Sequence, residues 1–293
     1  MVKTKSTVVT VVICLFAFVA GHTRDANNTS EVTLPSDNRY LGQKPPGTKA
    51  ELFAPEVIKY ETHDAPLISQ DETWLVTFAM EGEGGFYKLI DGKLSLTANP
   101  LNFDIPQICN GMAFSASEDR VYFLVWENGD ENFYYIERQE DRWTPPKSLG
   151  EEVNSFKTHW QFSVAVNENL YFSSEDRILV SRYDGDSHLR PVPLMLEDGS
   201  GLSGSTPFIA PDESYIIFSM DEDMHISYNM PNGKWTTPQT LGDDINSESL
   251  DLCPRISPNG KYLFFVSRRN GPDFLTFWAD ASFIEDLRPK ELE

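Results

Sequence analysis

The feature that most constrains this chain is a segment that recurs five times at a nearly constant interval. Each copy has a short apolar strand, a polar turn and a second strand that ends in aromatic or apolar residues. The second strands end at positions 77, 123, 172, 218 and 265, so the spacings are 46, 49, 46 and 47 residues. Self-similarity at a fixed period of about 20 to 50 residues is the signature of a repeat architecture.

The turn of the fifth copy predicts that each unit is an antiparallel hairpin. Its sequence is Ser257-Pro258-Asn259-Gly260. Proline presets φ, asparagine bonds its own backbone and glycine accepts a positive φ, which is the chemistry of a tight turn. The strand that follows, over 262–266, is nearly all apolar. Both of its faces should therefore be buried, as they are between stacked sheets.

Further strands follow each hairpin. We expect third strands over 86–90, 132–138, 178–183, 225–229 and 274–278. A motif of the form Trp-Thr-x-Pro-x-x-Leu-Gly begins at Trp143 and again at Trp235, and it marks an outermost strand, where proline is tolerated. Four short antiparallel strands per repeat of about 40 to 50 residues describe a β-propeller blade. The prediction is an all-β protein, a β-propeller of five four-stranded antiparallel blades.

The fifth unit has only three strands before the chain enters 282–289, for which we expect a short helix. Residues 50–58 carry the aromatic, proline and apolar pattern of the outer strands, so pairing them with the last blade would close the ring and cover both edges. Six blades are the alternative, but 40–62 leaves too little chain for four strands. The expected domains are a signal peptide over 1–21, a flexible leader over 22–48 and one propeller over 49–293, with blades near 63–105, 106–156, 157–202, 203–249 and 250–280.

Two repeats resemble the WD40-like PD40 repeat of TolB-type propellers. They are Ile-Ala-Pro-Asp-Glu-Ser-Tyr-Ile-Ile-Phe over 209–218 and Ile-Ser-Pro-Asn-Gly-Lys-Tyr-Leu-Phe-Phe over 256–265. Gln70, Ala116 and Val166 stand where that repeat usually has proline, and the amino-terminal domain of TolB has no counterpart here. The resemblance extends from about residue 40 to 289, and the leader and the end of the chain also resemble secreted bacterial propellers of this type. It implies a propeller and a binding scaffold, although a fold does not fix a function.

The first residues predict an exported protein. Lys3 and Lys5 precede an apolar run from Val8 to Ala20, and small residues follow it, as in a cleaved signal peptide. The run is too short for a membrane span. We therefore expect a secreted or periplasmic location. Cleavage leaves Cys109 and Cys253, which the repeats place in non-adjacent blades, so we favour unpaired thiols over a single bridge.

The charge excludes some partners. Subtracting 24 basic from 45 acidic residues gives a formal net charge of −21. A nucleic-acid protein needs a basic face, and an anionic membrane surface would repel this chain. We interpret the acidic clusters over 184–186 and 221–223 as solvated hairpin tips and not as calcium sites. No cofactor, no bound metal, no nucleic-acid partner and a monomer are expected.

The loops before the first strands of a propeller gather at one mouth of its central channel, where a ligand site is plausible. We predict ligand-binding residues there at His63, Asp64, Asn110, His159, Trp160, Ser205 and Asp251, with Arg268 as an anion contact or an ion-pair partner of the acidic surface. No complete catalytic signature is present in the sequence. The favoured hypothesis is a non-catalytic binding scaffold for a protein, peptide or glycan. The alternative is a carbohydrate-active hydrolase or lyase that uses channel carboxylates and histidines.

Overall fold

A computed structural model of the chain describes residues 39–80, 84–98, 108–127, 129–140, 142–157 and 161–292, with no account of the side chains of 108–110. The signal peptide predicted over 1–21 and most of the predicted leader lie outside this range. The regular secondary structure of the described chain is nearly all β-strand. No helix within it is long and apolar enough to cross a membrane.

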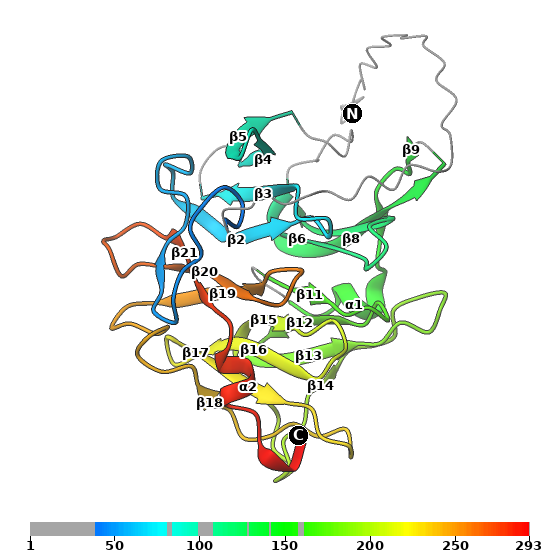
Figure 1. Cartoon of the computed structure of the whole chain (residues 1–293). Helices are drawn as coiled ribbons and strands as arrows, with labels where there is room; N and C mark the ends of the chain where they lie inside the picture. The colour runs from blue at the N-terminus through cyan, green and yellow to red at the C-terminus, as the bar shows by residue number, and fades with distance from the viewer. Residues whose placement is uncertain are drawn as a thin grey trace, which may run out of the picture. The chain divides into compact units, whose positions relative to one another are not determined.

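The strands form five antiparallel sheets, which confirms the predicted five-bladed propeller (Figure 1). The first blade contains β2 (Thr62–Ile68), β3 (Trp74–Ala79), β4 (Gly85–Ile90) and β5 (Lys93–Thr97). The second contains β6 (Ile108–Phe114), β7 (Arg120–Glu127), β8 (Asp130–Gln139), the short β9 (Arg142–Trp143) and β10 (Lys147–Ser148), followed by α1 (Glu151–Asn154).

The third blade contains β11 (Ser163–Val164), β12 (Leu170–Ser174), β13 (Arg177–Ser181) and β14 (Val192–Pro193). The fourth contains β15 (Ser205–Ile209), β16 (Tyr215–Met220), β17 (Asp223–Tyr228) and β18 (Gln239–Thr240). The fifth contains β19 (Asp251–Ile256), β20 (Tyr262–Ser267), β21 (Leu275–Asp280) and β1 (Glu51–Leu52), and the chain ends in α2 (Phe283–Asp286) and a 3₁₀ turn, η1 (Lys290–Leu292).

The first strand of each blade lies innermost. Strand β2 neighbours β6, β6 neighbours β11, β11 neighbours β15, β15 neighbours β19, and β19 returns to β2, so the inner strands form a closed ring. The apolar faces of each sheet pack against the next sheet, as the near-continuous burial of β7, β12, β16 and β20 shows. The inner strands run in the same direction, so their starts share one mouth of the channel.

The ring is closed by the amino-terminal strand, as the sequence predicts. Glu51 and Leu52 of β1 pair with Trp278 and Phe277 of β21. Just beyond β1, the ring of Phe53 meets Phe264 and Trp278 edge-on, with centroids 5.0 and 5.2 Å apart. Packing of β1 and Phe53 on the last blade therefore replaces the missing fourth strand.

The fold also takes in residues that precede β1. Tyr40 and Leu41 are buried in the same apolar cluster as Phe53. The side-chain oxygen of Gln43 accepts a hydrogen bond from the backbone of Ala54 at 2.9 Å. The end of the predicted flexible leader, from Tyr40 onward, therefore differs from expectation because its aromatic and aliphatic side chains bury against the closing blade.

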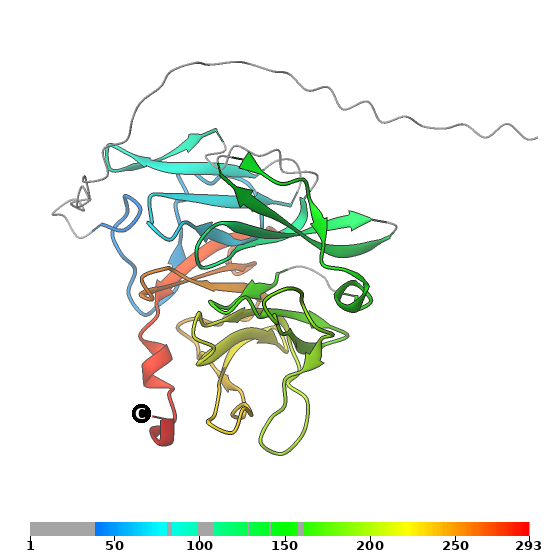
Figure 2. The ribbon, with the colours of Figure 1, turned by 90° about the vertical axis from the view of Figure 1, so that its right-hand side faces the viewer.

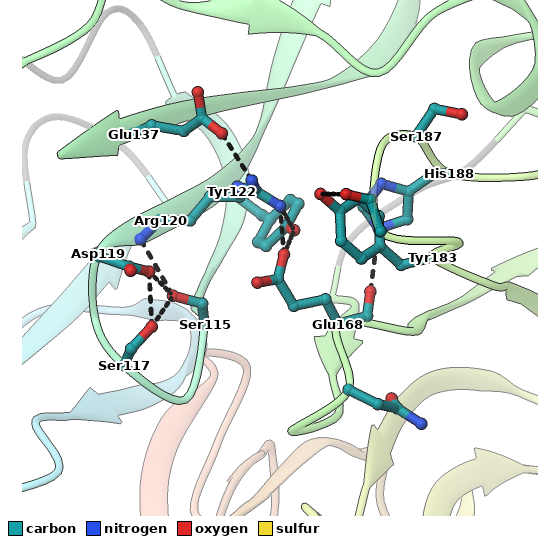
Figure 3. A network of polar contacts seen from close by, with 12 residues as sticks. Ser115, Ser117, Asp119, Arg120, Tyr122, Glu137, Glu168, Tyr183, Ser187 and His188 are labelled. Atoms are coloured by element: carbon teal, nitrogen blue, oxygen red, sulfur yellow. Dashed lines mark hydrogen bonds and ion pairs between the residues drawn. The ribbon is translucent and has the colours of Figure 1, made fainter. Parts of the chain in front are cut away.

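A repeated contact joins neighbouring blades at one end of the propeller. It is made by the turns that connect the first and second strands of the blades. The fourth turn residue of four blades is a glutamate with positive φ, and the fifth blade has a glycine at that place: Glu72, Glu118, Glu168, Glu213 and Gly260. Each glutamate carboxylate reaches the preceding blade. Figure 3 shows Glu168 of the third blade bound to Arg120 and to the Tyr122 hydroxyl of the second.

The interface between the fourth and fifth blades lacks such a glutamate, and the carboxyl-terminal segment covers it instead. The Tyr228 hydroxyl donates to the carbonyl of Ile284 at 2.5 Å, and the Gln239 amide donates to the carbonyl of Leu287 at 3.0 Å. Figure 2 shows the red carboxyl-terminal segment running beside the yellow strands of the fourth blade. Helix α2 therefore fastens the last two blades together.

Candidate functional site

The predicted site residues differ in what the structure says of them. Those within the described chain are His63 and Asp64 in β2, Ser205 at the start of β15, Asp251 at the start of β19, and Arg268 after β20. His159 and Trp160 lie outside the described residues, and so does the side chain of Asn110. The described members are all at or near the same mouth of the channel, and a role in ligand binding stays a prediction for each.

Asp64 is turned into the protein. It is buried, and its Oδ2 lies 2.8 Å from Nη2 of Arg255, which is also buried. Asp64 Oδ1 and Arg255 Nε have no hydrogen-bond partner among the described residues. Breaking such a buried pair is costly, because the remaining charge would lose its partner in a poorly hydrated interior. Asp64 therefore links the first and fifth blades.

Both carboxylate oxygens of Asp251 have partners. Its Oδ1 lies 2.7 Å from Nη2 of Arg269, and its Oδ2 accepts hydrogen bonds from the backbone and hydroxyl of Ser247 at 2.7 and 3.0 Å. The guanidinium of Arg269 also lies over the rings of Phe265 and Phe277. Of the two adjacent arginines, Arg269 is thus the one that neutralises the channel carboxylate.

Arg268 and His63 lie closer to the surface of the mouth. The Arg268 guanidinium lies 4.0 Å from the centre of the Phe274 ring and 3.9 Å from Oε1 of Glu61. This is the ion pair with the acidic surface that the sequence offered as one of two roles for Arg268. Burial lowers the pKa of His63, and the nearby Asp64 and Glu61 oppose that shift.

A cavity of about 550 Å³ opens at this mouth between the third, fourth and fifth blades. Its volume lies within the range of small-molecule and side-chain pockets. Apolar wall comes from Met220, Leu250 and Leu252, and hydroxyl groups come from serines and a threonine on the ends of β12, β15 and β16. Of the predicted site residues that the structure describes, Ser205 lines it.

Two acidic hairpin turns border the cavity. Glu175 and Asp176 join β12 to β13, and Asp221 and Glu222 join β16 to β17. All four have positive φ, from 49° to 73°. A two-residue hairpin loop of this kind favours Asn-Gly or Asp-Gly, because a Cβ at positive φ costs about 1 kcal/mol. The backbone alone therefore does not explain why glutamates stand here.

These four carboxylates have no ion-pair or hydrogen-bond partner in the described part of the chain. Among the described residues that line the cavity, the one basic residue is Lys157, which lies 3.3 Å from Oδ1 of Asp130 and so pairs with a carboxylate outside the lining. Within the described part of the chain, the negative charge at the cavity mouth therefore has no basic partner. Clefts lined by one sign of charge raise the local concentration of oppositely charged ligands.

Polar groups are also free inside the cavity. Ser173 and Ser174 line it and are only 8% and 9% exposed, and neither hydroxyl is hydrogen-bonded to another described residue. Buried polar groups are normally hydrogen-bonded, so an unpaired hydroxyl in a cavity is available to a ligand or to water. By contrast Thr206 and Ser219 bond each other at 3.0 Å, and Ser219 donates to the carbonyl of Asp251.

The inner strands are strained beside the cavity. Thr206 in β15 and Cys253 in β19 have φ of 48° and 56°, each within a break in the strand register. A β-branched residue with positive φ is an outlier, and such strain persists where the surroundings impose it. The backbone amide of Cys253 donates to Thr206 Oγ1 at 3.2 Å, which holds the two bulges together. Cys253 is free and buried, and burial raises the pKa of its thiol.

Most residues of this cavity are not among those predicted from the sequence. Asp221 and Glu222, expected at solvated hairpin tips, are exposed, but they also border the cavity. A signal was present, because the pair Glu175-Asp176 precedes the pair Asp221-Glu222 by 46 residues, which is one repeat. Acidic pairs at equivalent positions of successive blades must lie on the same face of a propeller.

A smaller, mostly apolar pocket of about 180 Å³ lies toward the opposite end of the inner strands. Its lining includes Arg255, the partner of Asp64, together with aliphatic and aromatic residues from all five blades. None of the predicted site residues that the structure describes lines it. In the described part of the chain, no three His, Cys, Asp or Glu side chains come together as a metal site requires.

No protein-family model matches the chain, and no curated protein sequence matches it. Solved structures of similar fold include TolB from Acinetobacter baumannii, at 14% identity and a TM-score of 0.48, over 74% of this chain and 56% of that one. A protein from Agrobacterium tumefaciens assigned as TolB aligns at 19% identity and a TM-score of 0.45, over 71% of this chain and 70% of that one.

An engineered GH43 glycoside hydrolase with endo-xylanase and exo-arabinofuranosidase activity aligns at 12% identity and a TM-score of 0.49, over 79% of this chain and 52% of that one. The chain thus spans little more than half of the Acinetobacter TolB and of the hydrolase. These likenesses concern the fold alone.

Proposed function

We propose that this chain is an exported, TolB-like propeller of the PD40 type that acts as a non-catalytic binding scaffold. Its ligand, a protein, peptide or glycan, enters the cavity at the channel mouth between the third, fourth and fifth blades. One observation carries the proposal: an open cavity of about 550 Å³ in which hydroxyls and carboxylates have no described partner. Hydroxyl and carboxylate groups that open onto a cavity without a described partner are what a ligand with complementary donors would satisfy.

We also propose where the protein is located and that it is a monomer. Residues 1–21 act as a signal peptide, and the mature chain is a monomer in the periplasm or outside the cell. Amino-terminal sequencing of the exported protein tests the first part, with cleavage after Gly21 expected. An intact Met1 on protein recovered outside the cytoplasm would contradict it.

Capture of the ligand tests the scaffold itself. Mature protein is immobilised as wild type, as Ser205→Trp, which places a large ring in the cavity, and as Ser187→Trp, which places the same ring at an exposed position away from it. Circular dichroism and melting temperature establish that all three are folded. We expect one partner, identified by mass spectrometry after cross-linking to cavity residues, on wild type and Ser187→Trp but not on Ser205→Trp. Equal recovery on all three would refute a ligand site at the mouth.

The carbohydrate-active alternative depends on the same carboxylates, because glycosidases use a pair of them across an open pocket. Glu175 and Glu222 come from adjacent blades and border one cavity. A panel of polysaccharides and aryl glycosides separates the two hypotheses. Turnover that is lost in Glu175→Gln or Glu222→Gln would establish an enzyme, and the scaffold proposal predicts that no substrate is turned over.

A further inference from the structure

We infer that the group received by the mouth cavity is a lysine or arginine side chain, presented by a peptide segment of a protein partner. This inference rests on the proposed scaffold function and specifies the chemistry of its ligand. It follows from three properties of the cavity: an uncompensated acidic border, free hydroxyl oxygens inside, and an apolar wall.

The acidic border selects the sign of the ligand. The Glu175-Asp176 and Asp221-Glu222 turns approach the cavity from two adjacent blades, and no described basic residue pairs with them. Lys157 is already paired with Asp130. A cationic ligand is attracted by four carboxylates, whereas an acidic peptide is repelled.

The interior selects the shape of the ligand. The hydroxyl oxygens of Ser173 and Ser174 can accept hydrogen bonds, and both residues are more than nine-tenths buried without a described partner. Ammonium and guanidinium groups have only N–H donors to offer, so they complement such oxygens. Met220 and Leu252 provide apolar surface for the methylene stem that lysine and arginine carry.

The backbone adds a reason to connect the carboxylates with binding. Each acidic pair occupies a turn in which both residues have positive φ, a conformation that favours glycine and asparagine. Equivalent strained acidic turns occur in the third and fourth blades, 46 residues apart, and both border the same cavity. The two turns flank the cavity as a pair, which fits a guanidinium or ammonium group between them.

The test measures binding of five-residue peptides Ac-Gly-Ser-X-Ser-Gly-NH₂, in which X is arginine, lysine, norleucine or glutamate, by isothermal calorimetry or fluorescence. We expect the arginine and lysine peptides to bind and the norleucine and glutamate peptides to bind at least about tenfold more weakly. Raising the salt from about 0.05 M to about 0.5 M should weaken binding of the basic peptides, because exposed charges are screened.

Charge-neutralising variants locate the effect. Two double variants should each bind the arginine peptide about tenfold more weakly. They are Glu175→Gln with Asp176→Asn, and Asp221→Asn with Glu222→Gln. The matched control is Asp91→Asn with Glu140→Gln. It also removes two exposed carboxylates from turn positions with positive φ, but in turns that follow the third strands, which lie at the other end of the blades. The control should leave the affinity unchanged, and melting temperatures should be similar in all three.

Three other results would contradict a basic side chain as the ligand. Equal binding of all four peptides, blocked by Ser205→Trp, would overturn the charge selectivity and leave the scaffold proposal standing. If free agmatine or Ca²⁺ binds as tightly as the arginine peptide, the ligand of the cavity is a small cation and not the side chain of a protein partner, and this inference is overturned. No binding of any peptide would overturn this inference, and the scaffold proposal would then be decided by the capture experiment alone.

Discussion

The phenol hydroxyl of Tyr171 lies 2.6 Å from Oε1 of Glu213, and this hydrogen bond joins the third blade to the fourth. The same carboxylate accepts hydrogen bonds from the side-chain amides of Asn169 at 2.7 Å and Asn167 at 3.0 Å. Burial and the neighbouring Glu213 raise the pKa of Tyr171, so the phenol remains a donor at neutral pH. Glu213 adopts a φ of 62°, and its three contacts offset the strain of that conformation.

Replacement of Glu213 by glycine should destabilise the protein although it relieves the backbone. The relief is worth about 1 kcal/mol, whereas the loss of three hydrogen bonds to a carboxylate costs about 3 kcal/mol or more. Glu118→Gly is the matched control, because Glu118 has a φ of 53° and accepts a single hydrogen bond, from the exposed backbone amide of Gln70. Urea unfolding should show Glu213→Gly less stable than Glu118→Gly by about 2 kcal/mol. Equal stabilities would show that the contact between the blades contributes nothing.

The buried pair of Asp64 and Arg255 predicts strong coupling between the first and fifth blades. Arg255→Met leaves a buried carboxylate without its partner and should destabilise the fold by about 3 to 5 kcal/mol. Asp64→Asn together with Arg255→Met removes both charges and should be more stable than Arg255→Met alone. A double-mutant cycle in urea measures this coupling. Additive effects of the two changes would contradict it.

Closure of the ring by the amino-terminal strand predicts a large effect at one aromatic side chain. Phe53 is almost fully buried between Phe264 and Trp278, so Phe53→Ala should cost about 3 to 5 kcal/mol. Val57→Ala, a partly buried neighbour in the same cluster, should cost far less. Thermal unfolding followed by circular dichroism checks both. A melting temperature unchanged by Phe53→Ala would mean that this segment is not needed for closure.

His188 predicts a loss of stability in mild acid. Burial lowers its pKa in the folded state, and its ring nitrogen Nε2 bonds the carbonyl of Glu168 at 3.0 Å. Below the unfolded-state pKa of about 6.5, His188 binds a proton more readily in the unfolded chain than in the folded one. The stabilising contribution of neutral His188 is therefore complete above that pH and declines as the pH falls. His188→Gln should therefore reduce the drop in stability between about pH 7.5 and about pH 5.5. His63, whose pKa is also lowered by burial, accounts for part of any drop that remains.

The sequence predicted the blades well because their information is local and repeated. The turn at Ser257–Gly260 and the apolar strand after it contain the hairpin chemistry in a few consecutive residues, and the period of about 46 repeats it five times. The closing strand was predictable for the same reason, since Phe53 and Pro55 repeat the outer-strand pattern. Burial of Tyr40 was not, because it depends on a surface formed by Trp278 and Tyr262 at the far end of the chain.

The site was only partly predictable, because the end of a strand does not say which way its side chain turns. Asp64 and Asp251 lie at the mouth, as their positions indicate, yet both side chains turn inward to arginines. Asp64 pairs with Arg255, which is distant in sequence, and Asp251 pairs with Arg269 and not with the adjacent Arg268. The positive φ of Thr206 has no sequence signal, since threonine rarely adopts it. The acidic turns were visible in the sequence, but the cavity between them exists only after the blades assemble.

The most direct test of this account is a nuclear magnetic resonance map of the arginine peptide on isotope-labelled protein. Amide signals of Ser174, Ser205 and Leu252 should shift as the peptide is added, and the same signals should stay in place with the glutamate peptide. The Asp221→Asn, Glu222→Gln variant should need about tenfold more peptide for the same shifts, while its remaining spectrum stays that of the folded protein. Shifts centred on the apolar pocket around Phe114 and Ile256 at the other end of the channel, or no difference between the two peptides, would contradict a basic side chain in the mouth cavity.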